Sequence, residues 1–280
     1  GLTAQATVSI IISPVNNAPE FNNFPSSQIA YEDTEKEIEG ISISDEDIAD
    51  DDMEIQLSVD NGAITLSSIN GLIFSLGDGD SDGSLIFSGS ITNISNAIAP
   101  LIFMPNENFN GDVQLEVEVN DLGGTGAGGP LTVTENLLIT VNPVNDNPTA
   151  IDDSGTTDED TAFTSNVMSN DFDLDSSSDN SPDNHFSLTV NSVPITDVQN
   201  GILTLSIDGE FTYEPNANYF GTDTFVYELS DGAGGNSQGT VNIIVSGVND
   251  SPVLTIPTDK YTDEDIPISI DGIIFTDIDI

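Results

Sequence analysis

Apolar and polar positions along the chain follow the pattern of short β-strands. They alternate, or stay apolar for the length of one strand, in VQLEVEV (113–119), LLITVNPV (137–144) and VNIIVSGV (241–248). No stretch carries a long helical period, so the pattern predicts an all-β chain. The segment ITNISNAIAPLIFMP (91–105) is an exception, because it can hold one helical turn before Pro100.

The region from 149 to 246 predicts one complete β-sandwich. Asn200-Gly201 and Asp208-Gly209 supply turn chemistry on either side of ILTLSI. Seven short strands in about 100 residues are typical of a Greek-key sandwich of the immunoglobulin type. The expected strands lie near 149–157, 162–168, 186–193, 201–206, 210–214, 223–230 and 238–246.

A proline-containing stretch recurs three times, as SPVNNAP (13–19), NPVNDNP (142–148) and SGVNDSP (246–252). Each is followed by an acidic triplet (YEDT at 31–34, DEDT at 158–161, DEDI at 263–266) and then by a run containing Asp-x-Asp. Later, PNENFNGD (105–112) corresponds to PNANYFGTD (215–223), and Gly-rich loops follow both. Such self-similarity indicates a tandem array.

The array predicts tandem seven-stranded Greek-key β-sandwiches arranged end to end. We divide the chain into four parts on this pattern. Residues 1–17 match the last strand and linker of a preceding repeat, and residues 251–280 match the beginning of a third. Repeat 1 covers 18–146 and repeat 2 covers 147–250.

Charge narrows the classes of function. The chain has 49 acidic residues against two basic ones, Lys36 and Lys260, and a formal net charge of −47. Nucleic-acid binding is excluded because it needs cations to neutralise phosphates, and docking on an anionic membrane is disfavoured. No apolar run approaches the roughly 20 residues that span a bilayer, so no membrane insertion is predicted for this region.

Catalysis is not predicted either. The absence of Cys excludes disulfides, thiolate catalysis and Cys-type zinc sites. His185, the single histidine, has no partner for a zinc site or a triad. Carboxylates are abundant, but the sequence singles out no pair suited to glycoside hydrolysis.

The motifs VNDNP and VNNAPEF, the Glu-Asp triplets and the Asp-x-Asp runs together resemble cadherin repeats, specifically the cadherin-like repeats of very large bacterial surface adhesins. The likeness covers nearly the whole chain. In such arrays the linker and adjacent loops hold calcium, which makes the junction rigid. The resemblance therefore implies an extracellular location at the bacterial cell surface. One departure is Asn17, which stands where the other linkers have Asp146 and Asp250, so this junction is expected to bind fewer ions or to bind more weakly.

Loop geometry predicts which acidic residues meet. Connections in an antiparallel sandwich alternate between its two ends, so the acidic triplet of one repeat and the Asp-x-Asp loop of the next should face the same linker. The junction at 144–148 would gather Glu32, Asp33, Asp112, Asn145, Asp146, Asn147, Asp171, Asp173, Asp175 and Asp231. The following junction would gather Glu159, Asp160, Asp223, Asn249, Asp250, Asp277 and Asp279. The preceding one would gather Asn16, Asn17, Asp45, Asp47 and Asp121.

Calcium is the cation that suits these clusters. Two like charges about 4 Å apart repel by roughly 4 kcal/mol at an effective dielectric constant of 20. Ca²⁺ takes six to eight oxygen ligands, whereas Mg²⁺ demands a tighter octahedron and retains water. We therefore predict Ca²⁺ as the bound ion, with the linker Asn and Asp side chains as ligands and the prolines fixing the path of the chain.

Three acidic features leave two interpretations open. Asp78, Asp80, Asp82 and Gly83 have the spacing of a calcium loop, but the twelfth position is Gly89, so a solvated hairpin loop is the alternative. The run DEDIADDDME (45–54) either adds ligands to Asp45 and Asp47 or forms a solvated face. Asp33 and Asp160 are either ligands or turn residues.

The sequence thus predicts a calcium-rigidified extender in a large exported adhesin, holding adhesive domains away from the cell. Its partners would be calcium ions, neighbouring repeats of the same chain and a cell-surface glycan or protein. The alternative is a calcium-dependent carbohydrate-binding or homophilic adhesion module. The low aromatic content of 6%, without Trp, weighs against the carbohydrate alternative.

Overall fold

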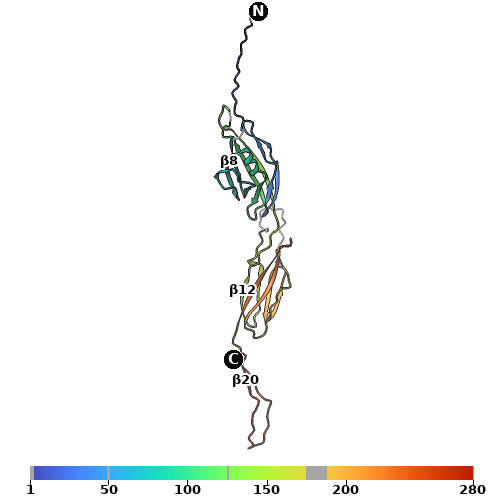
Figure 1. Ribbon diagram of the computed structural model, residues 1–280. Helices are drawn as coiled ribbons and strands as arrows, with labels where there is room; N and C mark the ends of the chain where they lie inside the picture. Colours follow the sequence, from blue (N-terminus) through green and yellow to red (C-terminus); the bar gives the residue numbers. More distant parts are fainter. Residues whose placement is uncertain (1–2, 49–50, 125, 175–187, 280) are drawn as a thin grey trace. The chain divides into compact units, whose positions relative to one another are not determined.

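A computed structural model describes residues 3–48, 51–124, 126–174 and 188–279. It divides the chain into two compact units, Gly1–Val144 and Asn145–Ile280. Both units consist of β-strands joined by short loops, as Figure 1 shows, so the predicted all-β class is confirmed. Among the described residues no helix is long and apolar enough to cross a membrane.

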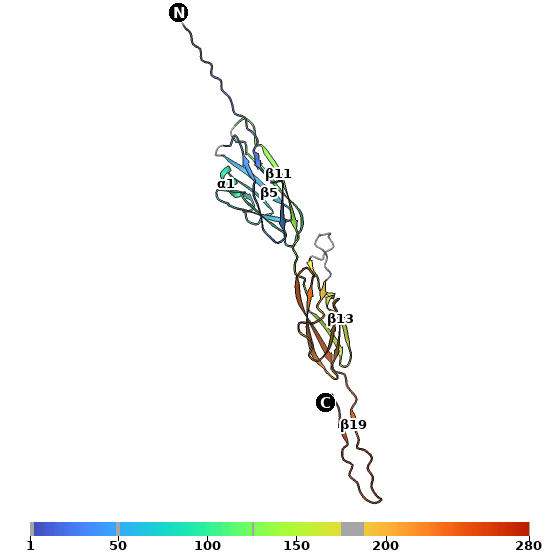
Figure 2. The same ribbon diagram turned by 90° about the vertical axis from the view of Figure 1, so that its right-hand side faces the viewer.

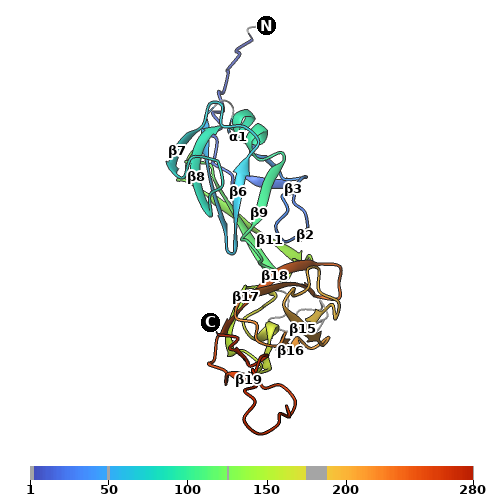
Figure 3. The same ribbon diagram turned by 90° about the horizontal axis from the view of Figure 1, so that it is seen from below.

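The first unit is a sandwich with one wide sheet. Its order is β2 (Ser27–Tyr31), β11 (Thr132–Asn142), β10 (Gly111–Asn120), β5 (Asp52–Val59), β8 (Ser84–Ser90) and β7 (Ile73–Leu76). A three-stranded sheet contains β3 (Lys36–Ile38), β9 (Leu101–Pro105) and β6 (Gly62–Leu66), which Figure 3 shows next to one another. β1 (Glu20–Asn23) pairs with β4 (Ser42–Ser44).

Alternation along the strands builds the core of this unit. On β10, Val113, Leu115, Val117 and Val119 are buried, while the polar residues between them lie outward. This is the pattern that a strand with one buried face requires. The core therefore follows directly from the period-two pattern in the sequence.

The predicted helical segment is a short helix, α1 (Ile91–Ala97), which Figure 2 shows beside the strands of the first unit. Ser90 caps it by accepting a hydrogen bond from the backbone N–H of Asn93, and Ile94 and Ala97 face the core. Along the sequence, β7, β8 and α1 all come between β6 and β9. This insertion accounts for the greater length of the first repeat.

The second unit has the same plan without the insertion. One sheet has the order β12 (Asp153–Asp158), β18 (Asn236–Ser246), β17 (Gly221–Ser230) and β14 (Thr189–Val190). The other contains β13 (Phe163–Asn166), β16 (Glu210–Pro215) and β15 (Gly201–Leu205), and the 3-10 turn Val167–Ser169 follows β13. β19 (Val253–Thr255) pairs with β20 (Ile274–Thr276).

Aromatic side chains fill the core between these sheets. The ring of Phe211 lies 5.7 Å from that of Phe163 and 5.1 Å from that of Phe225, both edge-on. The expected strand 149–157 begins only at Asp153, because Thr149 pairs with Phe172 instead. In the expected strand near 186–193, residues 186 and 187 lie outside the described part of the chain, and β14 covers only Thr189–Val190.

One pairing positions the acidic triplets in both units. β2 pairs in parallel with β11, and β12 pairs in parallel with β18, whereas the ladders between longer strands are antiparallel. Parallel strands end at the same edge of a sheet. The residue after β2 or β12 therefore lies beside the linker that follows the last strand.

Candidate functional site

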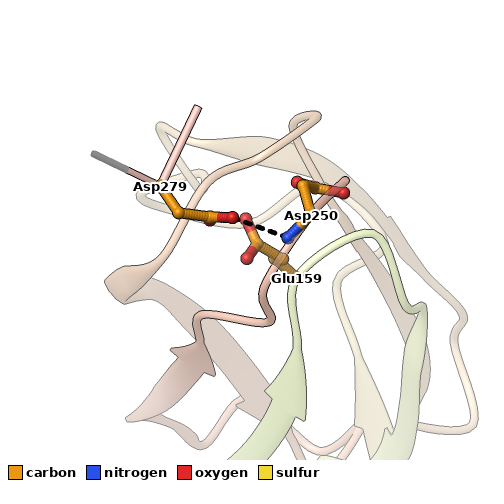
Figure 4. Close-up of side chains that lie close together, drawn as sticks. All are labelled: Glu159, Asp250 and Asp279. Carbon is orange, nitrogen blue, oxygen red and sulfur yellow. Dashed lines mark hydrogen bonds between the residues drawn. The ribbon is translucent and has the colours of Figure 1, made fainter. Parts of the chain in front are cut away.

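Among the described residues, Glu159, Asp250 and Asp279 form one acidic group with metal-site geometry. One carboxylate oxygen from each lies within 4.8 Å of the other two. Glu159 follows β12 and is buried, Asp250 lies in the linker after β18, and Asp279 follows β20 (Figure 4). The sequence analysis assigned all three residues to one junction.

Glu159 is held by the linker itself. Its backbone N–H donates to the carbonyl of Ser246 at 2.9 Å, and its Oε1 accepts the backbone N–H of Val248 at 2.5 Å. Glu32 repeats both contacts in the first unit, with the carbonyl of Asn142 at 2.9 Å and the N–H of Val144 at 2.6 Å. The parallel pairing of the preceding strands creates this arrangement, so each glutamate fixes the linker through one carboxylate oxygen. The second oxygen of Glu32 accepts the side-chain amide of Asn110 at 3.4 Å.

The Asp-x-Asp loops also hydrogen-bond to the linkers. Asp279 Oδ2 accepts the backbone N–H of Asp250 at 2.6 Å, as Figure 4 marks, and Asp277 Oδ1 accepts the N–H of Asp279 at 3.1 Å. In the first unit, Asp47 Oδ2 accepts the N–H of Asn17 at 2.6 Å, and Asp45 Oδ1 accepts the N–H of Asp47 at 2.7 Å. The two loops therefore share one construction.

The linker asparagines contact the Gly-rich loops. Asn16 Nδ2 donates to Asp121 Oδ2 at 2.7 Å, and Asn145 Nδ2 donates to Asp231 Oδ2 at 2.8 Å. Asn249, the third linker asparagine, donates to the carbonyl of Asp250 at 2.9 Å. The asparagine amide of the first two linkers thus fixes a buried aspartate beside the linker.

Asp231 stays ionised in this position. Its burial alone would raise the pKa, but hydrogen bonds from Asn145 and from the backbone N–H groups of residues 233–235 lower the pKa below its ordinary value. A Cβ at Gly235 would lie 2.1 Å from Asp231 Oδ2, 2.9 Å from the carbonyl oxygen of Asp146 and 3.0 Å from Asn147 Oδ1. Three oxygens of the expected ligand set therefore converge on a position that only glycine leaves open.

Asp33 and Asp160 have the geometry of turn residues. Their φ angles are +55° and +58°, and their carboxylates accept the backbone N–H of Asn108 at 2.9 Å and of Asn218 at 3.1 Å, respectively. Aspartate tolerates this left-handed conformation better than most residues. The structure thus gives both residues the turn role that the sequence analysis offered as one alternative.

Asp223 and Asp112 bind other parts of their own units. Asp223 is buried and accepts the N–H groups of Gln199 and Asn200 at 3.0 and 2.7 Å and the hydroxyl of Tyr213 at 3.1 Å. Asp112 Oδ1 accepts the hydroxyl of Thr140 across the β10–β11 ladder at 2.9 Å. The structure does not bring Asp223 into the group of Glu159, Asp250 and Asp279.

Strand register separates Asp171 from the other Asp-x-Asp residues. The pairs Glu20–Ser44, Thr149–Phe172 and Val253–Thr276 are equivalent. Asp173 therefore corresponds to Asp45 and Asp277, and Asp175, which lies outside the described residues, corresponds to Asp47 and Asp279. Asp173 is buried. Asp171 falls where the other repeats have Ile43 and Phe275.

The carboxylate of Asp171 is engaged inside the second unit. It accepts the hydroxyl of Tyr227 at 3.0 Å and the backbone N–H of Ile151 at 2.7 Å. Burial raises its pKa, and these hydrogen bonds oppose the rise. Asp153 lies nearby, and its pKa is raised to about 6 by burial first and by the charge of Asp171 second. The sequence analysis did not single out Asp153, and the adjacent pair of aspartates in IDDSG was the signal available.

The loop at 78–83 closes on its own backbone. Asp82 Oδ2 accepts the N–H groups of Asp78 at 3.0 Å and Gly79 at 2.9 Å, and Asp78 Oδ1 accepts the N–H of Asp80 at 3.1 Å. The loop joins β7 to β8, so its geometry agrees with the hairpin alternative. In the run 45–54, residues 49 and 50 lie outside the described part, and Asp52 begins β5.

The donors at the Glu159 site fit a hard, oxygen-seeking cation. The site offers carboxylates, and Asp250 Oδ2 is a buried atom with no hydrogen-bond partner among the described residues. In the first unit, Asn16 Oδ1 and Asp45 Oδ2 are also buried without such a partner in the described part of the chain. A buried oxygen without a hydrogen-bond partner destabilises the folded state unless water or an ion contacts it. Ca²⁺ is suited to them because it accepts carboxylate, amide and carbonyl oxygens in flexible geometry.

The junction at 144–148 draws its expected ligands from both units. Glu32, Asp33 and Asp112 belong to the first, whereas Asn145, Asp146, Asn147, Asp173 and Asp231 belong to the second. Its assembly into one site stays a prediction.

Comparison with solved structures shows low identity. The chain is similar to the extracellular cadherin domains 1–5 of protocadherin gamma B2, with 17% identity, a TM-score of 0.44, and coverage of 93% of this chain and 46% of that one. Protocadherin gammaB7 EC3-6 is 13% identical with a TM-score of 0.48, and the match covers 95% of this chain and 61% of that one. The endo-fucoidan hydrolase MfFcnA4 of glycoside hydrolase family 107 is 15% identical with a TM-score of 0.26, and the match covers 85% of this chain and 31% of that one. The chain thus spans less than two thirds of each of these structures.

Comparison at the level of sequence families gives a sharper result. None of the curated proteins matches the chain. Residues 145–247, which contain all of the second sandwich, match the family described as the bacterial cadherin-like domain. The resemblance to cadherin-like repeats drawn from the linker and acidic motifs is confirmed by this match of residues 145–247 to the bacterial cadherin-like domain.

Proposed function

We propose that the chain is a calcium-rigidified extender of an exported bacterial adhesin, in which ions at the linkers hold successive repeats in line. The single observation that carries the proposal is the group Glu159, Asp250 and Asp279, in which three elements distant in sequence present carboxylates within 4.8 Å of one another. The family assignment of residues 145–247 supports an extracellular adhesion-type module.

The electrostatics of this group favour a bound cation. Carboxylates about 4 Å apart repel by roughly 4 kcal/mol per pair at an effective dielectric constant of 20. The chain has only two lysines and no arginine to offset the repulsion. Ca²⁺ offsets it by taking oxygens from all three side chains at about 2.3–2.6 Å. Glu159, Asp250 and Asp279 would hold the ion, and Asp277 would support Asp279 through its backbone.

Rigidity follows from what these residues are attached to. Glu159 is fixed to the end of β12 and to the linker, and Asp279 is fixed to the β20 end and to the same linker. An ion bonded to both carboxylates opposes any motion that separates the two elements. Without the ion, the same charges repel and favour opening. Calcium therefore acts as a switch between a stiff and a flexible linker.

The affinity would match an extracellular role. Extracellular calcium modules bind at about 10⁻⁴–10⁻³ M. At about 10 mM Ca²⁺, one such site stabilises the folded state by about 1.4–2.7 kcal/mol through mass action. The sites would fill when the chain meets the higher calcium concentration outside the cell.

The test is thermal unfolding in chelator, in millimolar Ca²⁺, and in Mg²⁺ or NaCl at matched ionic strength. Specific coordination predicts that only Ca²⁺ raises the unfolding midpoint. Equal stabilisation by all three salts would mean general screening of a highly acidic chain and would overturn the calcium sites. Small-angle scattering tests the stiffening itself, with a longer and less variable particle expected in Ca²⁺ and superposable profiles counting against it.

A further inference from the structure

The Gly-rich loop between β10 and β11 is longer than its counterpart between β17 and β18, although both contain the sequence GAGG (126–129 and 232–235). Each loop begins with an aspartate whose backbone N–H closes it. Asp121 donates to the carbonyl of Leu131 at 3.1 Å, ten residues further along. Asp231 donates to the carbonyl of Gly235 at 3.3 Å, only four residues further along. The first loop thus has more residues within the same closure.

The extra length changes which groups bind the aspartate. In the second unit, the backbone N–H groups of residues 233–235 donate to the carboxylate of Asp231. In the first unit, the carboxylate of Asp121 accepts the N–H groups of Gly123 and Leu131, each at 2.8 Å. The aspartate of the first unit therefore has donors outside its GAGG segment.

The GAGG segment of the first unit pairs with the backbone of the linker. Ala127 donates its N–H to the carbonyl of Pro14 at 2.9 Å, and its carbonyl accepts the N–H of Asn16 at 3.2 Å. Val15 and Ala127 thereby form a parallel bridge. The side chain of Asn16 adds a hydrogen bond from Nδ2 to the carbonyl of Gly129 at 3.1 Å. The segment thus contacts three consecutive linker residues through its backbone.

The second unit has a simpler contact between loop and linker. Asn145 donates from Nδ2 to Asp231 at 2.8 Å, as Asn16 donates to Asp121 at 2.7 Å. Within the described residues of the second unit, the GAGG segment makes no backbone-to-backbone hydrogen bond with residues 145–147. The asparagine contact is therefore common to both loops, and only the first loop adds backbone pairing.

The paired atoms of the first loop carry no net charge. Hydrogen bonds between backbone N–H and carbonyl groups do not depend on a cation, unlike a group of carboxylates that repel one another. The next linker residue, Asn17, is also uncharged, whereas Asp146 and Asp250 stand at the equivalent positions. Asn16 is only 6% exposed, so its contacts are shielded from water. The first linker thus combines less repulsion with contacts that need no ion.

We propose that residues 126–129 are a calcium-independent clip, which keeps the linker 14–16 attached to the first sandwich when calcium is absent. The linker at 248–250 is held through Glu159 and Asp279, and under the proposed function it loosens without the ion. Removal of calcium therefore acts on the two linkers differently. The path of the chain into the first sandwich stays fixed, while the linker after the second sandwich becomes flexible.

Hydrogen exchange of single backbone amides, followed by NMR on the whole chain, tests the clip. The spectra are recorded in chelator and in millimolar Ca²⁺. In chelator, the amides of Asn16 and Ala127 should exchange at least about tenfold more slowly than in an unstructured chain, because two hydrogen bonds must open together. Calcium should change these two rates little. Unprotected exchange of both amides in chelator would overturn the proposal.

A matched pair of glycine substitutions tests whether the GAGG segment causes the protection. A Cβ at Gly126 would lie 2.6 Å from the backbone nitrogen of Asn16 and 2.7 Å from the carbonyl carbon of Val15, whereas a Cβ at Gly129 meets nothing within 4 Å. Both glycines are exposed and lie outside the core. In chelator, Gly126→Ala should speed exchange at Asn16 about tenfold, and Gly129→Ala should change it little. Equal rates in the two variants would contradict the clip.

A deletion variant tests the same point without introducing a clash. Removal of residues 122–125 and 130–131 leaves the order Asp121-GAGG-Thr132, which matches Asp231-GAGG-Asn236 of the second unit. The contact between Asn16 and Asp121 should persist, because the second unit makes it with the short loop. The Asn16 amide should nevertheless lose its protection in chelator. Retained protection would show that the GAGG pairing does not hold the linker.

The amide of Asp250 separates this proposal from the calcium proposal in the same spectra. Its N–H donates to Asp279 Oδ2, so its protection should rise with Ca²⁺ and fall in chelator. Protection of Asn16 in chelator together with a calcium-insensitive Asp250 would support the clip and count against the calcium-held linker. Loss of Asn16 protection in chelator together with a calcium-sensitive Asp250 would overturn the clip and leave the calcium-held linker standing.

Discussion

The backbone N–H of Asp250 donates a 2.6 Å hydrogen bond to Asp279 Oδ2, so a linker residue and the end of the next Asp-x-Asp loop are in direct contact. Asn17 and Asp47 make the same contact at the same distance in the first unit. The linker backbone thus hydrogen-bonds to one carboxylate oxygen of the loop aspartate in both units. Whether a second negative charge lies next to that aspartate depends on the side chain of the linker residue. In the first unit that side chain is an uncharged amide.

Replacing Asp279 by Asn should weaken calcium binding at the Glu159 site. The amide oxygen still accepts the N–H of Asp250, but one of three negative charges is lost. We expect the calcium dissociation constant to rise about tenfold, on the order of 1.4 kcal/mol. Calorimetric titration measures the change. Glu210→Gln removes one charge from an exposed position of β16 and should leave the affinity unchanged. Equal effects of the two variants would point to screening alone.

Replacing Asn17 by Asp should give the first unit the linker carboxylate found in the other two repeats. We expect an increase in calcium-dependent stabilisation, because the new carboxylate follows Asn16, which contacts Asp121, and its own backbone N–H is bound by Asp47. In chelator the same variant should be less stable than the original chain, because the added charge meets Asp47. Thermal unfolding with and without Ca²⁺ measures both signs. Asn136→Asp, on the exposed face of β11, is the control and should show no gain with calcium.

The raised pKa of Asp153 predicts a pH-dependent stability of the second unit. Its folded-state pKa is about 6, against an ordinary value of 3.8. The folded state therefore binds this proton more tightly than the unfolded state, so the carboxyl favours folding below pH 4 and this advantage is lost as the pH rises through 6. Asp153→Asn should raise stability by about 1 kcal/mol at pH 7.5, since solvent screening reduces the full effect, and by only about a fifth of that at pH 4.

Chemical unfolding in chelator at the two pH values measures this difference. Asp152→Asn is the matched control, because its amide oxygen still accepts the N–H of Thr240, as Asp152 Oδ1 does at 2.8 Å, and the charge of Asp152 is the smallest contribution to the raised pKa of Asp153. It should stabilise the unit much less than Asp153→Asn at pH 7.5. A stabilisation by Asp153→Asn that is the same at both pH values would contradict the assignment to this carboxyl.

Substitution of Gly235 should damage the Gly-rich loop of the second unit. A Cβ there would lie 2.1 Å from Asp231 Oδ2 and 2.9 Å from the carbonyl oxygen of Asp146. We expect Gly235→Ala to cost about 1–3 kcal/mol of stability, as in other overpacked sites, and to weaken calcium binding through Asp231. Gly129→Ala is the matched control in the loop of the first unit, where a Cβ meets nothing within 4 Å. It should be nearly neutral in denaturant unfolding.

Local pattern was sufficient for much of the fold. The alternation on β10, β17 and β18, the turns at Asn200-Gly201 and Asp208-Gly209, and the short helix before Pro100 could all be predicted, because each depends on neighbouring residues. The recurring linkers predicted the repeat. The alternation of loops assigned Glu159, Asp250 and Asp279 to one junction together with Asp160, Asp223, Asn249 and Asp277, and the structure groups the first three carboxylates. Their binding of an ion stays a prediction.

Tertiary structure decided what each remaining carboxylate contacts. Asp171 and Asp173 are alike in sequence, yet the pairing of Thr149 with Phe172 separates them and turns Asp171 toward Tyr227. Asp223 on β17 accepts a hydrogen bond from the hydroxyl of Tyr213 on β16. These two strands are consecutive in sequence but belong to opposite sheets. A shift of strand register by one residue moves a side chain to the other face, and register depends on partners distant in sequence. The sequence by itself thus determined where acidic loops occur, and only the folded structure determined which of their oxygens remain available to an ion.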